Sequence, residues 1–306
     1  MRRLQDAFMH DLSEGVLSAL LTRVRGDHTL DLQIRENYVN VYYRGGSLIC
    51  ARADATGGYA LDFNNRYLDF PGAPPSTGVA PSTSIRTADD CSAWLTNVPF
   101  LKDVMDRWFA LHPWREREAQ QLLTRENTWD TAVAGGTDFF VCDLEYVKNG
   151  RRADIVGVHW PSTGHARKRR SGHRLVFAEL KFGDSALSGE CGLVEHVRGA
   201  ESLAADASVL GEIKQEMVGL FSQKHRLGLV QTKHVLDGFS DEPPEMLIVV
   251  ANHDPESTLL RKELEAIAIA QPNHVEVRVG HASAFGYGLY DDFFMDVRTY
   301  LARFPG

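Results

Sequence analysis

An apolar run that ends in two opposite charges occupies residues 175–181 and reads LVFAELK. Alternate residues of a strand point to the same face, so Glu179 and Lys181 are expected to lie side by side. Burying an acid and an ammonium group in an apolar strand is costly, which indicates a functional site. Upstream, residues 152–158 read RADIVGV and place Asp154 at the start of a second apolar run. Two adjacent strands are therefore predicted to bring two carboxylates and one lysine to one end of a sheet.

These side-chain types suit the hydrolysis of a phosphodiester. Carboxylate oxygens are hard ligands for Mg²⁺ or Mn²⁺, and such an ion neutralises charge on the phosphorus centre and lowers the pKa of a bound water. A lysine can orient or deprotonate that water and stabilise the transition state. The pattern therefore favours metal-dependent phosphodiester chemistry.

The elements around the two charged strands are predicted to follow one another as helix, three strands, helices, strand, helix, strand. Helical periodicity extends over 101–125, with an interruption at Pro113, and over 193–203, 210–225 and 257–270. Strand-like runs occupy 139–147, 153–160, 174–182, 246–251 and 274–279. This order predicts an α/β fold in which helices flank a mixed sheet.

At these residues the chain resembles the PD-(D/E)xK nuclease superfamily, whose restriction-endonuclease-like core runs helix, three strands, helix, strand. The resemblance covers residues 101–279 and implies that Asp154 and Glu179 bind the metal ion, Mg²⁺ or Mn²⁺, and that Lys181 is the catalytic lysine. The proline of the family motif is Ala153 here, a departure that is common in this degenerate motif. The resemblance thus implies a restriction-endonuclease-like fold and nuclease activity.

Many members of the superfamily add a catalytic glutamate from the helix before the first strand. The corresponding helix here offers three candidates: Glu116, Glu118 and Glu126. Glu118 is favoured because it shares a helical face with Leu111 and Leu122, which places it at the edge of the core. On the first strand, Asp143 and Glu145 are candidates for a supporting place beside the metal.

Positive charge is concentrated in one part of a chain whose formal net charge is −8. Residues 148–174 contain eight Lys or Arg and one acid, a net +7 that leaves −15 for the rest of the 306 residues. Within this window, Arg167, Lys168, Arg169 and Arg170 are candidates for sequence-independent contacts with phosphates. The alternative is a solvated loop. His196, just after the third strand, is a candidate for a substrate contact.

The N-terminal part has a different pattern. Residues 1–70 predict a helix followed by a small antiparallel sheet, with a hairpin turn at Gly45-Gly46. Residues 70–84 contain four of the twelve prolines, so 71–88 is predicted to be a linker. We therefore expect an accessory α+β module at 1–70, with a role in recognition, and a nuclease-like domain at 89–306.

Composition excludes several classes of protein. With 43% hydrophobic and 24% charged residues the chain falls in the globular range. Its apolar runs are shorter than the ~20 residues of a membrane span, and we expect a cytoplasmic protein without a membrane partner. The four cysteines form no C-x-x-C pair and are expected to be buried and reduced. No glycine-rich phosphate-binding motif or G-x-S-x-G element is present.

The sequence therefore predicts a Mg²⁺-dependent nuclease whose partner is nucleic acid, with DNA expected before RNA. A module that kept the nuclease fold but binds nucleic acid or protein without catalysis is the alternative, and an enzyme of unrelated chemistry is a third. Substrate specificity and the formation of a homodimer stay open at this point.

Overall fold

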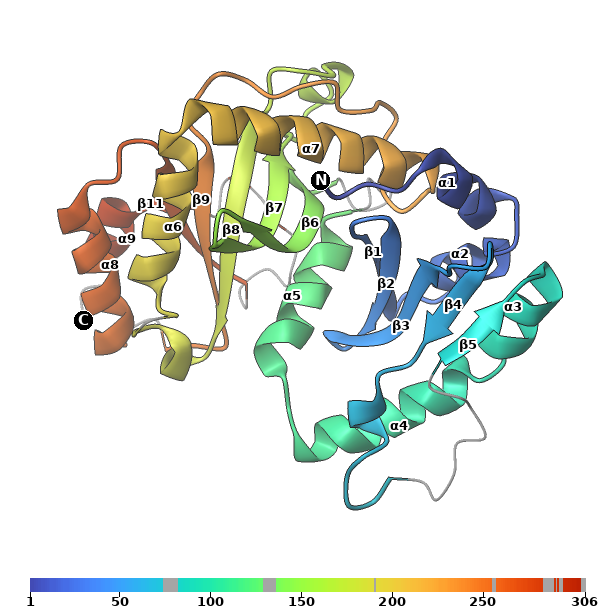
Figure 1. Cartoon of the computed structure of the whole chain (residues 1–306). Helices are drawn as coiled ribbons and strands as arrows, with labels where there is room; N and C mark the ends of the chain where they lie inside the picture. Colours follow the sequence, from blue (N-terminus) through green and yellow to red (C-terminus); the bar gives the residue numbers. More distant parts are fainter. Residues whose placement is uncertain are drawn as a thin grey trace. The chain divides into compact units, whose positions relative to one another are not determined.

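The computed structural model describes residues 1–73, 82–128, 136–189, 191–254, 257–282, 289, 291 and 294–303 (Figure 1). The chain divides into two compact units. Unit 1 contains residues 1–121 and 223–229, and unit 2 contains residues 122–222 and 230–306.

Unit 1 is built on a five-stranded antiparallel sheet in the order β1-β2-β3-β4-β5. Its strands are β1 (Leu30–Ile34), β2 (Tyr38–Tyr43), β3 (Gly46–Ala53), β4 (Tyr59–Asp62) and β5 (Ser82–Ile85). The turn between β2 and β3 has φ of 51° at Arg44 and 76° at Gly45. Two successive positive φ values are typical of a type I′ turn, so the predicted hairpin is present, with its turn at Arg44-Gly45, one residue before the predicted glycine pair.

Helices pack on this sheet. They are α1 (Asp6–Ser13), α2 (Ser18–Arg25), α3 (Ala88–Leu95), α4 (Val98–Leu111) and the first part of α5 (Arg115–Glu126), with the short helix η1 (Asn65–Tyr67). The N-terminal segment forms two helices instead of the single predicted one. Thr87 and Asp90 start α3 with a capping box, in which each side chain accepts a hydrogen bond from the backbone of the other.

The division between the units falls later than the linker predicted at 71–88. Residues 82–85 of that segment form strand β5, while residues 74–81 lie outside the described residues. The cause is the packing of α4, which was assigned to the second domain. Trp108 lies edge-on to Tyr67, with ring centroids 5.2 Å apart, and the Tyr43 hydroxyl donates to Asp106 at 3.0 Å. These contacts make α4 part of unit 1.

Unit 2 is built on a six-stranded mixed sheet in the order β11-β10-β9-β8-β7-β6. The strands are β6 (Phe139–Lys148), β7 (Arg151–His159), β8 (Arg174–Phe182), β9 (Glu245–Ala251), β10 (Glu276–His281) and β11 (Met295–Asp296). The pairs β6/β7, β7/β8 and β10/β11 are antiparallel, whereas β8/β9 and β9/β10 are parallel. Every residue of β9 is buried, as its continuous apolar run predicts for a parallel strand.

The helices of unit 2 agree with the periodicity of the sequence. They are α6 (Leu193–Ala205), α7 (Ala207–Arg226), which ends in unit 1, α8 (Thr258–Ala270) and α9 (Val297–Arg303), with the short helices η2 (Ala166–Lys168) and η3 (Asp184–Ala186). Figure 1 shows α6 and α8 side by side next to β8 and β9. Ser257 caps α8 by accepting a hydrogen bond from the Leu260 backbone at 3.4 Å. The predicted mixed α/β architecture is confirmed.

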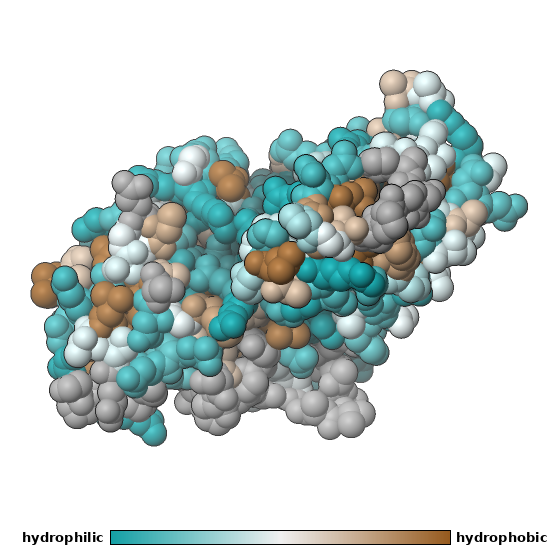
Figure 2. Space-filling model, turned by 90° about the horizontal axis from the view of Figure 1, so that it is seen from below, coloured by the Kyte–Doolittle hydropathy of each residue, from teal (hydrophilic) through white to brown (hydrophobic). Residues whose placement is uncertain are grey.

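The surface seen in Figure 2 shows hydrophobic residues as separate spots among hydrophilic ones. In the part of the chain that the structure describes, no helix combines the length and the apolar character that crossing a membrane requires. All four cysteines are free thiols. Cys91 and Cys142 are buried as expected, Cys50 is half-buried, and Cys191 is exposed, because it lies in the loop before α6 and not on a strand.

Candidate active site

The register of the β7/β8 pair brings the two predicted metal ligands together. Ile155 pairs with Ala178 in this antiparallel ladder, so the next residues in line are Asp154 and Glu179. Residues directly opposite each other share a face of the sheet, with Cβ atoms about 5 Å apart. Lys181 follows Glu179 on the same face of β8. The three residues singled out in the sequence therefore converge at one end of β7 and β8.

Glu179 is the centre of this cluster. Its side chain is 1% exposed, Lys181 Nζ lies 2.8 Å from its Oε1, and His196 Nδ1 lies 3.0 Å from its Oε2. Both contacts are ion pairs without the alignment of a hydrogen bond, so the two buried oxygens lack a well-aligned donor among the described residues. Burial opposes ionisation of Glu179, but His196 and Lys181 outweigh it and lower the pKa of this carboxyl group.

Asp154 has the opposite electrostatic state. Its side chain is 2% exposed, and Arg152 NH2 contacts its Oδ1 at 2.9 Å. Burial and the neighbouring charge of Glu179 raise the pKa of Asp154 to about 7, against the opposing effect of Arg152, His196 and Lys181. His196 and Lys181 thus act on both carboxyl groups, while the two acids repel each other. Such shifted pKa values are common at functional sites.

Arg152 connects Asp154 to a strained position on β6. The same guanidinium nitrogen contacts Glu145 Oε1 at 2.8 Å. Glu145 has a φ of 53°, a left-handed conformation that is costly for a non-glycine residue inside a strand and that tends to occur at functional sites. Glu145 is therefore linked to Asp154 through Arg152. Asp143 is buried, and its Oδ1 accepts a hydrogen bond from the Leu144 backbone at 2.9 Å.

α6 positions His196 over Glu179. The helix begins at Leu193 after a short loop, and residue 196 lies in its first turn. The His196 side chain is 15% exposed and that of Arg152 is 44% exposed, whereas the carboxylates are almost fully buried. Solvent therefore reaches the cluster at His196 and Arg152. The structure places the predicted substrate contact next to the predicted metal ligands.

The donor set suits a hard divalent cation. Mg²⁺ is typically held by one or two carboxylates and completes its octahedral shell with waters and substrate phosphates. Asp154 and Glu179 provide two such groups, and the buried Glu179 oxygens lack aligned hydrogen bonds. Among the described residues no group of three or more His, Cys, Asp or Glu side chains is arranged to hold an ion. A Mg²⁺ ion at this position would need water and phosphate oxygens for the rest of its shell.

Glu118 is not brought into this cluster by any described contact. It lies on the part of α5 that belongs to unit 1, and its carboxylate pairs with Arg44 at 2.9 Å. Arg44 also contacts Asp106 at 2.9 Å. The predicted helical face was wrong, because Leu111 is exposed and ends α4, whereas Glu118 lies on α5 and contacts the β2–β3 hairpin through Arg44.

The basic loop lies at the far end of the β7–β8 hairpin, because it joins the end of β7 to the start of β8 (Figure 1). Five residues of extended chain separate Asp154 from His159, which corresponds to about 17 Å. Arg167 packs over the Phe140 ring at 4.4 Å and donates to the Thr137 carbonyl. Its side chain is therefore built into the fold.

The other three basic residues of the loop are exposed. Arg170 pairs with Asp237 at 2.8 Å, and Arg169 donates to the Gly172 carbonyl at 3.3 Å. Lys168 lies at the end of η2. A phosphate in contact with these three side chains would therefore lie far from Asp154 and Glu179.

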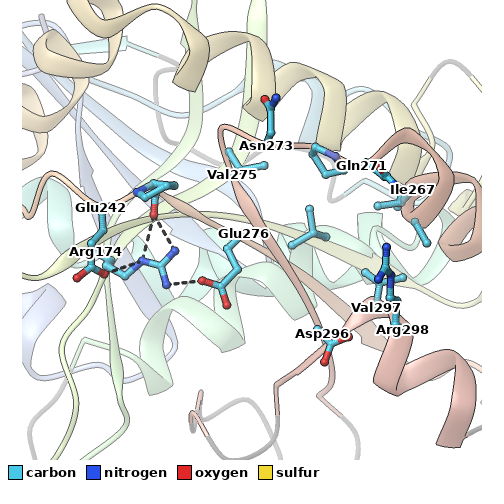
Figure 3. A pocket seen from close by; sticks show the side chains of 14 residues that line it. Arg174, Glu242, Ile267, Gln271, Asn273, Val275, Glu276, Asp296, Val297 and Arg298 are labelled. Carbon is cyan, nitrogen blue, oxygen red and sulfur yellow. Dashed lines mark hydrogen bonds and ion pairs between the residues drawn. The ribbon is translucent and has the colours of Figure 1, made fainter.

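A hollow of about 720 Å³ in unit 2 lies apart from the cluster (Figure 3). Figure 3 shows Arg174 at one side of it, bonded to Glu276, whose carboxylate is 2.6 Å away. It is lined by Arg174, Glu242, Pro243, Ile267, Ala268, Gln271, Pro272, Asn273, Val275, Glu276, Val277, Asp296, Val297 and Arg298. None of these residues belongs to the Asp154 cluster, so the chemistry of the cluster is independent of this hollow.

Arg152 is the functional candidate that the sequence analysis did not single out. A signal for it exists: Arg152 precedes Asp154 by two residues, so strand parity puts both on one face of β7. The sequence analysis named Glu145 together with Asp143 and did not choose between them. Strand alternation could not make that choice, because the left-handed backbone of Glu145 departs from the regular alternation of β6.

Comparison of the chain with family models, with curated proteins and with solved structures found no match.

Proposed function

We propose that the chain is a metal-dependent nuclease that hydrolyses phosphodiester bonds with a metal-activated water. The observation that carries the proposal is the register of β7 and β8, which sets Asp154 opposite Glu179 and leaves Lys181 beside it. An acid with a raised pKa next to an acid with a lowered pKa in a buried site is typical of catalytic pairs.

The order of elements supports a restriction-endonuclease-like core. α5, the three antiparallel strands β6 to β8, the helices α6 and α7, and the strand β9, which is parallel to β8, follow one another with one helix more than the resemblance to the PD-(D/E)xK superfamily implies. A fold alone does not determine a function, so the weight of the proposal rests on the side chains at the end of β7 and β8.

In the proposed reaction, Asp154 and Glu179 hold Mg²⁺ or Mn²⁺. The ion supplies Lewis acidity toward the phosphate and lowers the pKa of a water. Lys181 would orient that water toward the phosphorus atom and would stabilise negative charge on the non-bridging phosphate oxygens. His196 holds the Glu179 carboxylate through its Oε2 and, being partly exposed, faces the incoming substrate. Arg152 contacts Asp154 and favours its ionised form, against burial and the charge of Glu179, which raise the pKa of Asp154.

The test is incubation of the purified chain with single- and double-stranded DNA and RNA in the presence of Mg²⁺, Mn²⁺ or EDTA. We expect cleavage with either metal, no cleavage in EDTA, and DNA among the substrates. Asp154→Asn is expected to abolish cleavage. Glu212→Gln is the matched control, because Glu212 is an acid of the same unit that is 59% exposed and paired with Lys148.

Three outcomes contradict the proposal. Cleavage by the Asp154→Asn variant at the wild-type rate excludes this site, and cleavage in EDTA excludes the metal. Binding of nucleic acid without cleavage under any metal condition identifies the alternative, a binding module that keeps the fold without the reaction. Circular dichroism of each variant separates loss of activity from loss of fold.

A further inference from the structure

Unit 1 carries a half-buried tryptophan at the corner between α4 and α5. Trp114 directly precedes α5, and its ring lies edge-on to Trp108 at 5.1 Å and to Phe109 at 5.8 Å. Trp108 and Phe109 are buried in the unit. The Trp114 ring is thus packed against the core, while it remains partly open to solvent.

Two exposed arginines lie over this ring. The Arg66 guanidinium is 5.3 Å from the ring centroid of Trp114, and that of Arg117 is 5.1 Å from it. Arg66 comes from η1 and Arg117 from α5, so two separate elements direct cations to one aromatic side chain. The nearby acid Glu118 is already paired with Arg44.

This arrangement contributes little to folding. An exposed pair of a cation and an aromatic ring stabilises a fold only weakly, and ordering an arginine side chain costs conformational entropy. The same groups suit a ligand with flat rings and negative charges. A base that stacks on an aromatic side chain contributes about 1–3 kcal/mol, and guanidinium groups pair with phosphates.

We propose that Trp114, Arg66 and Arg117 form a stacking platform that binds an unpaired base of a nucleic acid. The base takes the place of one guanidinium over the ring, and that guanidinium then moves to an adjacent phosphate. The choice of nucleic acid as partner rests on the proposed function. Beyond the proposed function, the stacking platform implies that single-stranded segments are the preferred ligand and that unit 1 binds them.

The test measures binding of the full chain in EDTA, where no metal-dependent cleavage takes place. Fluorescence anisotropy follows a labelled single-stranded DNA of about 16 nucleotides, the upper site size of single-strand binding folds. Trp114→Ala is expected to weaken binding about 5- to 150-fold, and Trp114→Phe to weaken it less. A duplex of the same sequence is expected to bind more weakly and to be insensitive to Trp114→Ala.

A second variant keeps the tryptophan and so guards against misfolding of Trp114→Ala. The double variant Arg66→Gln/Arg117→Gln is expected to reduce the slope of log affinity against log salt by about 0.7 for each lost phosphate contact. Arg107→Gln is the matched control, because Arg107 lies on α4, pairs with Asp103 at 2.9 Å, and is expected to leave binding unchanged.

The outcomes separate the platform from the nuclease proposal. Wild-type affinity in both Trp114→Ala and the double arginine variant overturns the platform, as does equal weakening for duplex and single strand or a wild-type chain that binds no single strand in EDTA. Strong, Trp114-dependent binding without cleavage in Mg²⁺ supports the platform and overturns only the nuclease.

Discussion

Two buried glutamates on neighbouring strands have similar cationic partners but differ in what else surrounds them. Glu179 on β8 and Glu245 on β9 are each 1% exposed. Glu245 is hydrogen-bonded to His159 at 2.7 Å and to Arg278 at 3.1 Å. Burial opposes its ionisation, but His159 and the two arginines Arg174 and Arg278 outweigh that effect and lower the pKa of Glu245.

This is the difference that we expect between a structural site and the proposed active site. Glu245 has aligned donors and no acid beside it with a raised pKa, so its charge is fully compensated by the fold. Glu179 lacks aligned donors and faces a second buried acid, Asp154, whose pKa is about 7. A buried pair of acids with shifted pKa values is typical of functional sites.

The largest expected effect is on catalysis. Glu179→Gln is expected to lower the cleavage rate on the order of 10³-fold or more, because losing a metal ligand removes several kcal/mol of transition-state stabilisation. Glu245→Gln is expected to retain the wild-type rate per folded molecule. The measurement is single-turnover cleavage at saturating Mg²⁺. Equal loss in both variants contradicts the distinction.

For the free energy of unfolding, we expect Glu245→Gln to have a larger effect than Glu179→Gln. Glu245→Gln is expected to lower the free energy of unfolding by about 3–5 kcal/mol, because it leaves Arg174 and Arg278 without their buried partner. Urea denaturation provides the measurement. Glu276→Gln is the matched control, since Glu276 also pairs with Arg174 but is 54% exposed, and it is expected to cost less than about 1 kcal/mol. A change below 1 kcal/mol in Glu245→Gln shows that the network is not structural.

The third prediction concerns pH. Asp154 has a pKa of about 7 in the folded chain against an ordinary value of 3.8, so the folded state binds more protons than the unfolded state between these values. The free energy of unfolding is therefore expected to fall as pH rises from about 4 to about 7, by roughly 3 kcal/mol in metal-free protein. Asp154→Asn is expected to remove this decrease. Urea denaturation at each pH checks it, and an identical pH profile in the variant contradicts it.

The smallest effect is expected at the basic loop. Replacing Lys168, Arg169 and Arg170 by Gln, with Arg167 retained for packing, is expected to flatten the salt dependence of duplex binding by about one unit for each lost phosphate contact. Cleavage at saturating substrate is expected to be unchanged, because the loop lies at the far end of the hairpin. Lys262→Gln, an exposed cation on α8, is the control. If the slope of log affinity against log salt is unchanged, the loop makes no contact with phosphates and is only exposed to solvent.

The hydrophobic periodicity of the sequence was sufficient to predict most of the helices and strands in the second half of the chain. Alternation and apolar runs predicted the strands 139–147, 153–160 and 174–182 within a few residues, and the glycine pair at 45–46 predicted the β2–β3 hairpin. The pairing of Glu179 with Lys181 followed from strand parity alone. These features are local, because they depend on residues close together in the chain.

Contacts between distant residues were decided by the tertiary structure. Glu118 pairs with Arg44, 74 residues away, and His196 reaches Glu179 only because α6 packs against β8. The position of Arg167 against Phe140 likewise depends on the pairing of β6 with β7. A helical face or a run of charges in the sequence indicates which residues lie near one another. It does not indicate which other helix or strand packs against them. Register and packing resolve that question because they are selected by the burial of the whole core, to which every element contributes.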